Sequence, residues 1–292
     1  ALKEDPANHI IRGEITRLKF ITGIHDNEDE KLAGGKSNES SQDSSALDYL
    51  FEDNNSDKLL IIFSSNGRAE KIANNEPPSF NFKNYLSTSH NVDKLFIRDV
   101  ERQYYVRNLG ASSRNIHDTV KLIKKLTSTK KYTKKVAIGA SAGGFAAILF
   151  ANLLRLDKAI AFNPQTVLSE EKETVINDLH FTVEKCRELR ELDKDDLFYQ
   201  KCLNLKNFVP FKCDVNIHYS SDSTNQIDKK HAEYIRHKRC KLIEHKSVTH
   251  LLALELKELN TLKAIILEPL QNRNRSESNR QNMLGKAKGF GC

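Results

Sequence analysis

The residues best suited to chemistry form a Gly-x-Ser-x-Gly pattern at Gly139, Ser141 and Gly143. An apolar run, residues 136–138, precedes the pattern, and small and apolar residues follow it as far as residue 147. In a strand–turn–helix setting such a turn strains the backbone at the serine and points its hydroxyl out of the sheet edge. The pattern therefore predicts that Ser141 is a nucleophile, if the chain also supplies a base.

A serine hydroxyl needs an imidazole to take its proton, and the imidazole needs a carboxylate to fix its tautomer. In open α/β sheets such groups lie on loops beyond the carboxyl ends of strands. His250 fits, because it follows the β-type run 240–244 by a short polar link. Asp222 fits as well, just after the run 215–219, whereas Asp228 suits the first turn of a helix, where the dipole favours an acid. We expect His250 to be the base and Asp222 its partner, with Asp228 as the rival.

Acyl chemistry also requires backbone N–H groups aimed at the developing oxyanion. One is expected from Ala142, directly after the serine. The other is expected from the loop that follows the apolar run 59–63, where Gly67 permits an unusual backbone turn. Asn66 and Gly67 are the favoured donors in this loop, and Ser65 is a further alternative.

The elements that would position these groups alternate between β-type runs and helical patterns. This alternation predicts an α/β fold with a mostly parallel central sheet and helices on both faces. After the fourth clear strand, the charged stretch 169–205 predicts a helical insertion that either caps the site as a lid or simply connects two strands. Its expected apolar anchors are Val175, Leu179, Val183 and Leu189. The expected strands are residues 59–63, 95–97, 136–138, 159–162, 215–219 and 240–244, and the expected helices 116–126, 227–237 and 251–267.

Composition shifts divide the chain into three parts. Residues 1–57 combine a β-type segment at 10–24 with a polar stretch, expected to be an exposed loop with a short apolar insert at 47–51. This part is expected to pack on the α/β domain, residues 58–270. Residues 271–292 hold five basic residues against one acidic residue, which predicts a basic, disordered tail.

Charge and cysteine usage narrow the functional classes. The net charge of the 292 residues is +7, yet the basic stretches at 121–135 and in the tail match no nucleic-acid-binding motif. No apolar run approaches the roughly 18 residues that span a bilayer. The five cysteines have no metal-ligand spacing, which indicates free thiols in a reducing compartment. We therefore expect a cytoplasmic protein without a metal or cofactor, and the oligomeric state stays open.

The order of these features resembles the α/β-hydrolase superfamily over residues 59–267: a strand, a glycine-bearing loop, the serine elbow, an acid after a late strand and a histidine before the last helix. More narrowly, the chain resembles a group of poorly characterised microbial proteins linked to cell-surface polysaccharide metabolism. The likeness to that group rests on residues 139–147, 161–166 and 96–99 and on the pair Tyr104 and Tyr105.

The resemblance implies acyl transfer through an acyl-enzyme, with Ser141 as nucleophile, His250 as general base and then acid, and Asp222 as the orienting carboxylate. It also implies an oxyanion hole that includes the Ala142 N–H. Two features depart from the superfamily pattern. The oxyanion loop lacks the usual His-Gly pair, and the strand before Asp222 ends without the glycine that is common there.

Three functions fit these residues. The first is a serine esterase acting on a small-molecule or saccharide ester, such as an acylated sugar, with Arg68 as a candidate to bind an anionic substrate group. The second is a non-catalytic interaction protein that keeps the fold. The third is an acyltransferase with the same three residues, in which a sugar hydroxyl replaces water as the acceptor.

Overall fold

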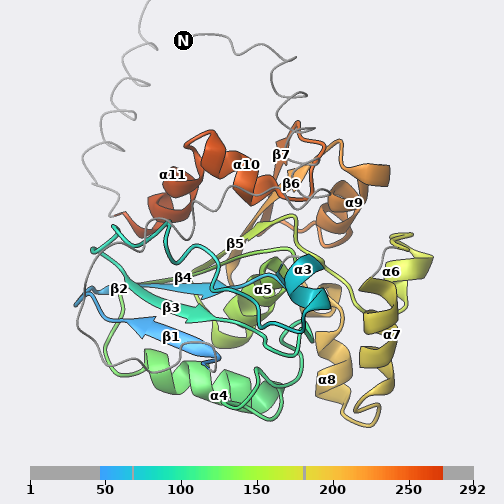
Figure 1. The fold of residues 1–292 in the computed structure, drawn as a ribbon, viewed down its shortest axis with the longest axis horizontal. Coiled ribbons are helices and arrows are strands. Elements are labelled where there is room, and N and C mark those ends of the chain that lie inside the picture. The colour runs from blue at the N-terminus through green and yellow to red at the C-terminus, as the bar shows by residue number, and fades with distance from the viewer. Residues whose placement is uncertain (1–46, 68, 180–181, 272–292) are drawn as a thin grey trace, which may run out of the picture.

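The computed structural model describes residues 47–67, 69–179 and 182–271. Its strands are β1 (Tyr49–Glu52), β2 (Lys58–Phe63), β3 (Asp93–Ile97), β4 (Lys134–Ala140), β5 (Lys158–Phe162), β6 (Asp214–Ser220) and β7 (Cys240–His245). They form one seven-stranded sheet in the order β1-β3-β2-β4-β5-β6-β7 (Figure 1). Strand β1 is antiparallel to β3, and every other neighbouring pair is parallel. The predicted mostly parallel sheet is confirmed.

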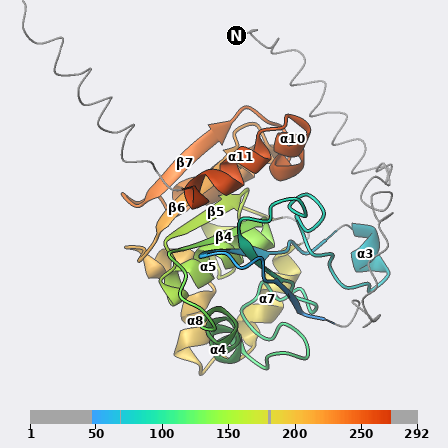
Figure 2. The ribbon, with the colours of Figure 1, turned by 90° about the vertical axis from the view of Figure 1, so that its left-hand side faces the viewer.

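Helices cover both faces of the sheet. The helices α10 (Leu252–Glu258) and α11 (Leu262–Leu267) pack on one face, and α4 (Ile116–Thr127) and α5 (Ala142–Leu154) on the other (Figure 2). The remaining helices are α3 (Ala69–Ala73), α6 (Glu171–Thr174), α7 (Thr182–Glu191), α8 (Leu197–Cys202) and α9 (Ile227–Tyr234), with 3₁₀ turns η2 (Leu205–Phe208), η3 (Thr224–Gln226) and η4 (Glu268–Leu270).

The buried strands explain the continuous apolar runs in the sequence. In β2, Leu59, Ile61 and Phe63 pack with α5 on one face. Leu60 and Ile62 point to the opposite face and pack with α10 and α11, because successive strand side chains alternate. A strand covered on both faces has no solvent side, so it needs no polar alternation.

Two sequence expectations are wrong in this part of the fold. The apolar insert at 47–51 is not part of an exposed loop, because β1 pairs with β3 as the edge strand of the sheet and its four residues are half-buried. The predicted single helix 251–267 is two helices, α10 and α11. The chain turns between them at Asn260, whose φ of 56° lies in the left-handed region that ends an α-helix.

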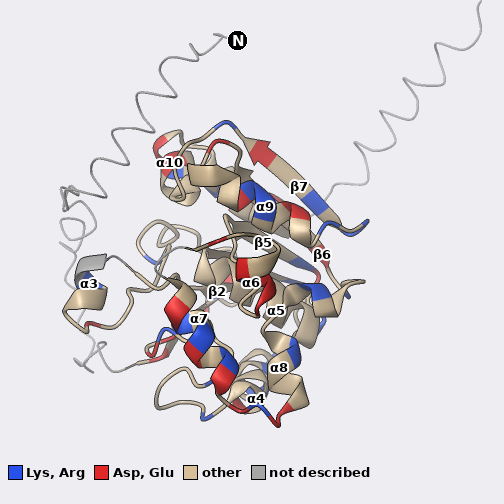
Figure 3. Ribbon diagram, turned by 90° about the vertical axis from the view of Figure 1, so that its right-hand side faces the viewer, with Lys and Arg blue, Asp and Glu red and all other residues tan. Residues whose placement is uncertain are grey.

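The insertion after β5 contains α6, α7 and α8, and Figure 3 shows acidic and basic residues alternating along α7. Of its expected anchors, Val183 and Leu189 are buried. Val175 and Leu179 are 60% and 67% exposed, so they are not anchors. The buried side chains of the insertion that belong to the core are Cys186, Leu189, Tyr199, Cys202, Leu203 and Leu205.

Several expectations concern residues outside the described ranges: the β-type segment 10–24, Arg68 and the tail from residue 272. Four cysteines within the described ranges, Cys186, Cys202, Cys213 and Cys240, are buried free thiols. Among the described helices, none combines the length and apolar character that a bilayer span requires.

Candidate active site

Ser141 lies in the sharp turn between β4 and α5. Its backbone has φ 52° and ψ −118°, a conformation that non-glycine residues rarely adopt. The flanking glycines make the turn possible, because a Cβ on Gly139 would lie 2.1 Å from the Gly143 carbonyl oxygen, and one on Gly143 would lie 2.2 Å from the Phe63 carbonyl oxygen. The Ser141 N–H donates to the Phe162 carbonyl at 2.9 Å, which ties the turn to the end of β5. The local structure is therefore the strained strand–turn–helix that the sequence pattern predicts.

His250 lies against this serine. Its Nε2 is 3.0 Å from the Ser141 Oγ, and its Nδ1 is 2.7 Å from the Asp228 Oδ1. The Asp228 side chain is 2% exposed, whereas that of His250 is 42% exposed. With the Nδ1 proton donated to the carboxylate, the Nε2 lone pair faces the serine hydroxyl and can accept its proton. The three side chains thus have the geometry of a serine, base and acid triad.

The carboxylate also shifts the protonation equilibrium of the base. Burial lowers the pKa of His250, but the charge and hydrogen bond of Asp228 raise it more, so the net pKa of His250 lies above its ordinary value of 6.5. A more basic imidazole accepts the serine proton more readily. It is also protonated, and unable to act as a base, over a wider range of acidic pH.

The acid that contacts His250 is Asp228, so the expectation for Asp222 is corrected. Asp222 is exposed, and its backbone N–H donates to the Ser247 carbonyl at 3.0 Å. Beyond β6 the chain passes through the turn η3, where Asn225 and Gln226 have φ values of 54° and 55°. This turn directs the start of α9 back toward His250, and Asp228 lies in its first turn. The rival residue at the helix N-terminus is therefore the one that meets the histidine.

The loop after β2, which is expected to supply an oxyanion donor, is held by hydrogen bonds to its peptide groups. Tyr105 Oη donates to the Ser64 carbonyl at 2.7 Å, and the Ser65 N–H donates to Asn81 Oδ1 at 2.6 Å. Ser65 is therefore engaged elsewhere and is a poor oxyanion donor. Arg102 Nε donates to the Asn66 carbonyl at 2.9 Å.

Three backbone N–H groups remain as candidate oxyanion donors. Within the described ranges, those of Asn66, Gly67 and Ala142 donate to no other residue. Ala142 is the first residue of α5, where helical N–H groups lack an intrahelical acceptor. All three therefore stay candidates, while Arg68 lies outside the described residues.

A second polar cluster, which sequence reasoning did not identify, joins the insertion to α9. Lys172 Nζ and His231 Nε2 both contact the Asp178 carboxylate, the histidine at 3.2 Å, and all three side chains are buried. The other ring nitrogen of His231 lies 3.0 Å from Thr166 Oγ1. Burial raises the pKa of Asp178, but the bonds and charges of His231 and Lys172 lower it by more. The net pKa lies below its ordinary value, so the carboxylate stays ionised. Because His231 lies one turn after Asp228, this cluster fixes the helix that carries the acid.

A third polar group lies at the end of β5, where Asn163 is fully buried. Its amide nitrogen donates to the His250 carbonyl at 3.0 Å and to Ser220 Oγ at 2.9 Å. The resemblance to microbial proteins rests partly on residues 161–166, which include Asn163, but it implies no role for this residue. The folded structure reveals its connection to the histidine, because the contact with the His250 carbonyl spans 87 residues of sequence.

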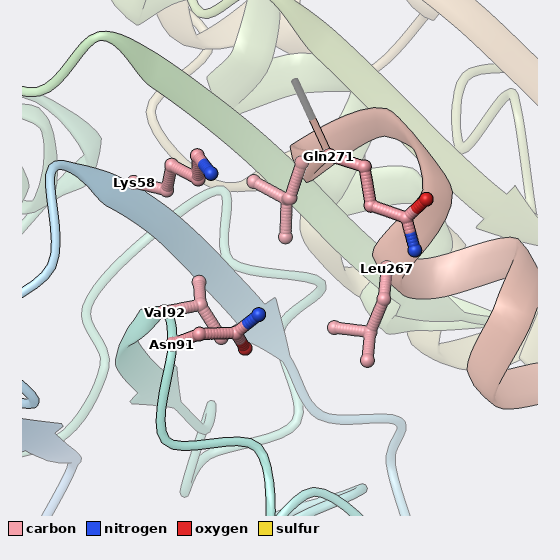
Figure 4. Close-up of a pocket in the computed structure, with 6 residues that line it drawn as sticks. Lys58, Asn91, Val92, Leu267 and Gln271 are labelled. Atoms are coloured by element: carbon pink, nitrogen blue, oxygen red, sulfur yellow. The ribbon is translucent and has the colours of Figure 1, made fainter. Parts of the chain in front are cut away.

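A pocket with a volume of about 240 Å³ lies away from these residues (Figure 4). Lys58 and Val92 line it at the amino-terminal ends of β2 and β3, whereas Ser141, Asp228 and His250 follow the carboxyl ends of strands. Polar and apolar side chains share its wall: Lys58, Asn91, Val92, Leu267, Leu270 and Gln271. In the described part of the chain, no group of three or more His, Cys, Asp or Glu side chains is arranged to hold a metal ion.

The chain is similar to several solved structures, although no protein-family model and no curated protein sequence matches it. The capsule O-acetyltransferase of Neisseria meningitidis serogroup A has 17% identity and a TM-score of 0.53, with 75% of this chain and 90% of that one covered. The same enzyme, as a histidine-to-alanine mutant in complex with CoA, has 18% identity, equal coverage and a TM-score of 0.50. MGS-M2, an α/β-hydrolase from a Medee basin deep-sea metagenome, has 16% identity over 77% of this chain and 94% of that one, with a TM-score of 0.45. The likeness to the O-acetyltransferase structures shows a shared fold, and the mostly parallel seven-stranded sheet with helices on both faces is α/β-hydrolase-like.

Proposed function

We propose that this protein is a serine hydrolase that cleaves a carboxylic ester of a small molecule or saccharide through an acyl-enzyme. One observation carries the proposal: Ser141 Oγ, His250 and Asp228 are joined by contacts of 3.0 and 2.7 Å. A surface serine without a catalytic role would not have a paired imidazole beside it. A purely structural histidine would not place its ring nitrogen against a serine on strained backbone. The α/β-hydrolase fold is consistent with acyl chemistry but does not select the substrate.

In the acylation step, His250 Nε2 takes the Ser141 hydroxyl proton as Oγ attacks the ester carbonyl carbon. The carbonyl oxygen becomes an oxyanion, which the N–H groups of Ala142 and of Asn66 or Gly67 stabilise. Collapse of this intermediate breaks the ester bond, and His250 returns its proton to the leaving alcohol. The Asp228 carboxylate stabilises the imidazolium while it exists.

In the deacylation step, His250 takes a proton from water, and the resulting hydroxide attacks the acyl carbon. The second tetrahedral intermediate collapses to release the carboxylic acid, and His250 returns the proton to Ser141 Oγ. Every proton moves through one nitrogen, Nε2, which is the atom that faces the serine. Neither step requires a group beyond those that the chain supplies.

A second candidate is acyl transfer to a sugar hydroxyl in place of water. Its support is the likeness to a capsule O-acetyltransferase, for which one of the two structures is a complex with CoA. The chemistry differs only in the acceptor, since the acyl-serine forms in the same way. A thioester such as acetyl-CoA would then be the acyl donor.

Labelling with a fluorophosphonate tests the activated serine. We expect the native chain to be labelled, Ser141→Ala to be unlabelled and His250→Ala to react at least about 10³-fold more slowly. The matched controls are Ser128→Ala and His90→Ala, which remove an exposed serine and an exposed histidine. Unlabelled but folded native protein contradicts the proposal and favours the non-catalytic interaction protein.

Product analysis then separates the two acceptors. Native protein is incubated with p-nitrophenyl acetate or acetyl-CoA, with and without a saccharide, and mass spectrometry follows the acyl group. Acetate as the product in every case supports the hydrolase. Acetylated saccharide formed at the expense of acetate, and absent with Ser141→Ala, supports the transferase instead.

A further inference from the structure

Asn163 connects the two halves of the proposed catalytic machinery. It directly follows β5, and its φ of 40° lies in the left-handed region, where asparagine is tolerated better than most residues. The preceding carbonyl, that of Phe162, accepts the Ser141 N–H at 2.9 Å. The backbone at this position therefore holds the nucleophile turn.

The Asn163 side chain holds the loop that carries the base. Its amide nitrogen donates to the carbonyls of His250 at 3.0 Å and Thr249 at 3.3 Å. Its amide oxygen accepts the Ser220 N–H at 2.8 Å, at the end of β6. Ser220 Oγ in turn donates to the Thr249 carbonyl at 2.6 Å. One buried side chain thus joins the ends of β5 and β6 to the loop after β7.

We propose that Asn163 is a positioning residue that sets the distance between the His250 ring and Ser141 Oγ, and this inference rests on the proposed function. The carbonyl of the preceding residue, Phe162, holds the serine, and the Asn163 side-chain amide holds the histidine, so both groups are fixed at the end of β5. The amide contacts the main chain of His250 and not its ring, so both ring nitrogens stay available to Asp228 and the serine. No contact joins Asn163 to the reacting atoms, so its role is to position and not to catalyse.

The contacts also explain why asparagine is required. The site needs an acceptor for the Ser220 N–H and a donor for two carbonyl oxygens, and an amide offers both. Aspartate would keep the acceptor but place a second oxygen against the carbonyls. Glycine would keep the left-handed backbone and remove every side-chain contact.

The test compares Asn163→Gly and Asn163→Asp with Asn260→Gly. Asn260 is also left-handed, with φ 56°, but lies between α10 and α11 and outside the proposed machinery, so its variant controls for the backbone change. For both Asn163 variants we expect kcat on p-nitrophenyl acetate and the fluorophosphonate labelling rate to fall about 10- to 100-fold with KM nearly unchanged, because a small displacement of a reacting group costs rate and not binding. Asn260→Gly should retain both rates.

The outcomes separate the inference from the proposed function. An unlabelled native chain overturns both. A labelled native chain with Asn163→Gly and Asn163→Asp at native rates overturns the inference alone, as does an equal loss in Asn260→Gly. If Asn163→Gly does not fold, Asn163→Asp and Ser220→Ala decide, since Ser220→Ala keeps the amide contact with His250 and should lose less rate than Asn163→Asp.

Discussion

Replacing Asp228 by asparagine should nearly abolish activity, whereas the same change at Asp222 should not. The carboxylate is buried and lies 2.7 Å from His250 Nδ1, so it holds the ring with Nε2 free to accept a proton. An asparagine amide can instead donate to Nδ1, which moves the ring proton to Nε2 and turns a donor toward Ser141. Loss of the correct tautomer lowers kcat about 10⁴-fold in serine enzymes with this arrangement, or about 5.5 kcal/mol in the barrier.

The pH dependence gives a second signature of the same change. His250 must be neutral to act as a base, and Asp228 raises its pKa, so the acid limb of log kcat/KM in the native enzyme should inflect above pH 6.5. Without the carboxylate the pKa of His250 falls, so the limb of Asp228→Asn should move to lower pH. Residual hydrolysis of p-nitrophenyl acetate, measured from pH 5 to 9, provides the curve.

Asp222→Asn is the matched control, because it makes the same chemical change on an exposed side chain beyond the same strand. Its rate should stay within about twofold of the native rate, as for most surface substitutions. A loss of more than about 100-fold in Asp222→Asn, with Asp228→Asn nearly intact, would refute the assignment of the acid. An unchanged acid limb in Asp228→Asn would refute the electrostatic part of the reasoning.

Two further predictions concern stability. Burial raises the pKa of Asp99 to about 7, so between pH 4 and pH 7 the folded protein keeps a proton that the unfolded chain releases. The contribution of this group to the free energy of unfolding is therefore fully present below pH 4. It declines by up to about 4 kcal/mol as the pH rises to 7. The difference in unfolding free energy between native protein and Asp99→Asn, from urea titrations, should follow this trend, and a pH-independent difference would contradict it. Gly143→Ala should lose at least about 3 kcal/mol and the fluorophosphonate label, because its Cβ would meet the Phe63 carbonyl oxygen at 2.2 Å; native-like stability and labelling would contradict the proposed elbow packing.

The sequence predicted the sheet well because its signals are local. Each buried strand is an apolar run that stands out from its charged surroundings, and the elbow needs its glycines within four residues of one another. Strand β1 was missed because its half-buried residues pair only on the edge of the sheet, where an amphipathic strand resembles a polar loop. The break at Asn260 was missed because the apolar spacing of α10 continues into α11.

The choice between the two acids depends on a turn that composition does not reveal. Both are aspartates that follow β6 within eight residues, in a mostly polar stretch of sequence. What separates them is the left-handed conformation of Asn225 and Gln226, which carries the chain back over the sheet edge. Asparagine favours such a conformation, but glutamine does not, so only the folded structure identifies Asp228 as the residue against His250.

The partial exposure of His250 to solvent matters for both candidate reactions, hydrolysis and acyl transfer. The His250 side chain is 42% exposed, so a second substrate can approach the nitrogen that activates the acceptor, and so can water. A transferase with this geometry must exclude water by binding its acceptor before the acyl-serine is hydrolysed, whereas a hydrolase has no such requirement. The ratio of acylated saccharide to free acid, measured as the saccharide concentration rises, therefore reports acceptor binding directly. If that ratio saturates, the protein has a specific binding site for the acceptor sugar. If the ratio rises in strict proportion to the saccharide concentration, the sugar reacts with the acyl-serine without binding first.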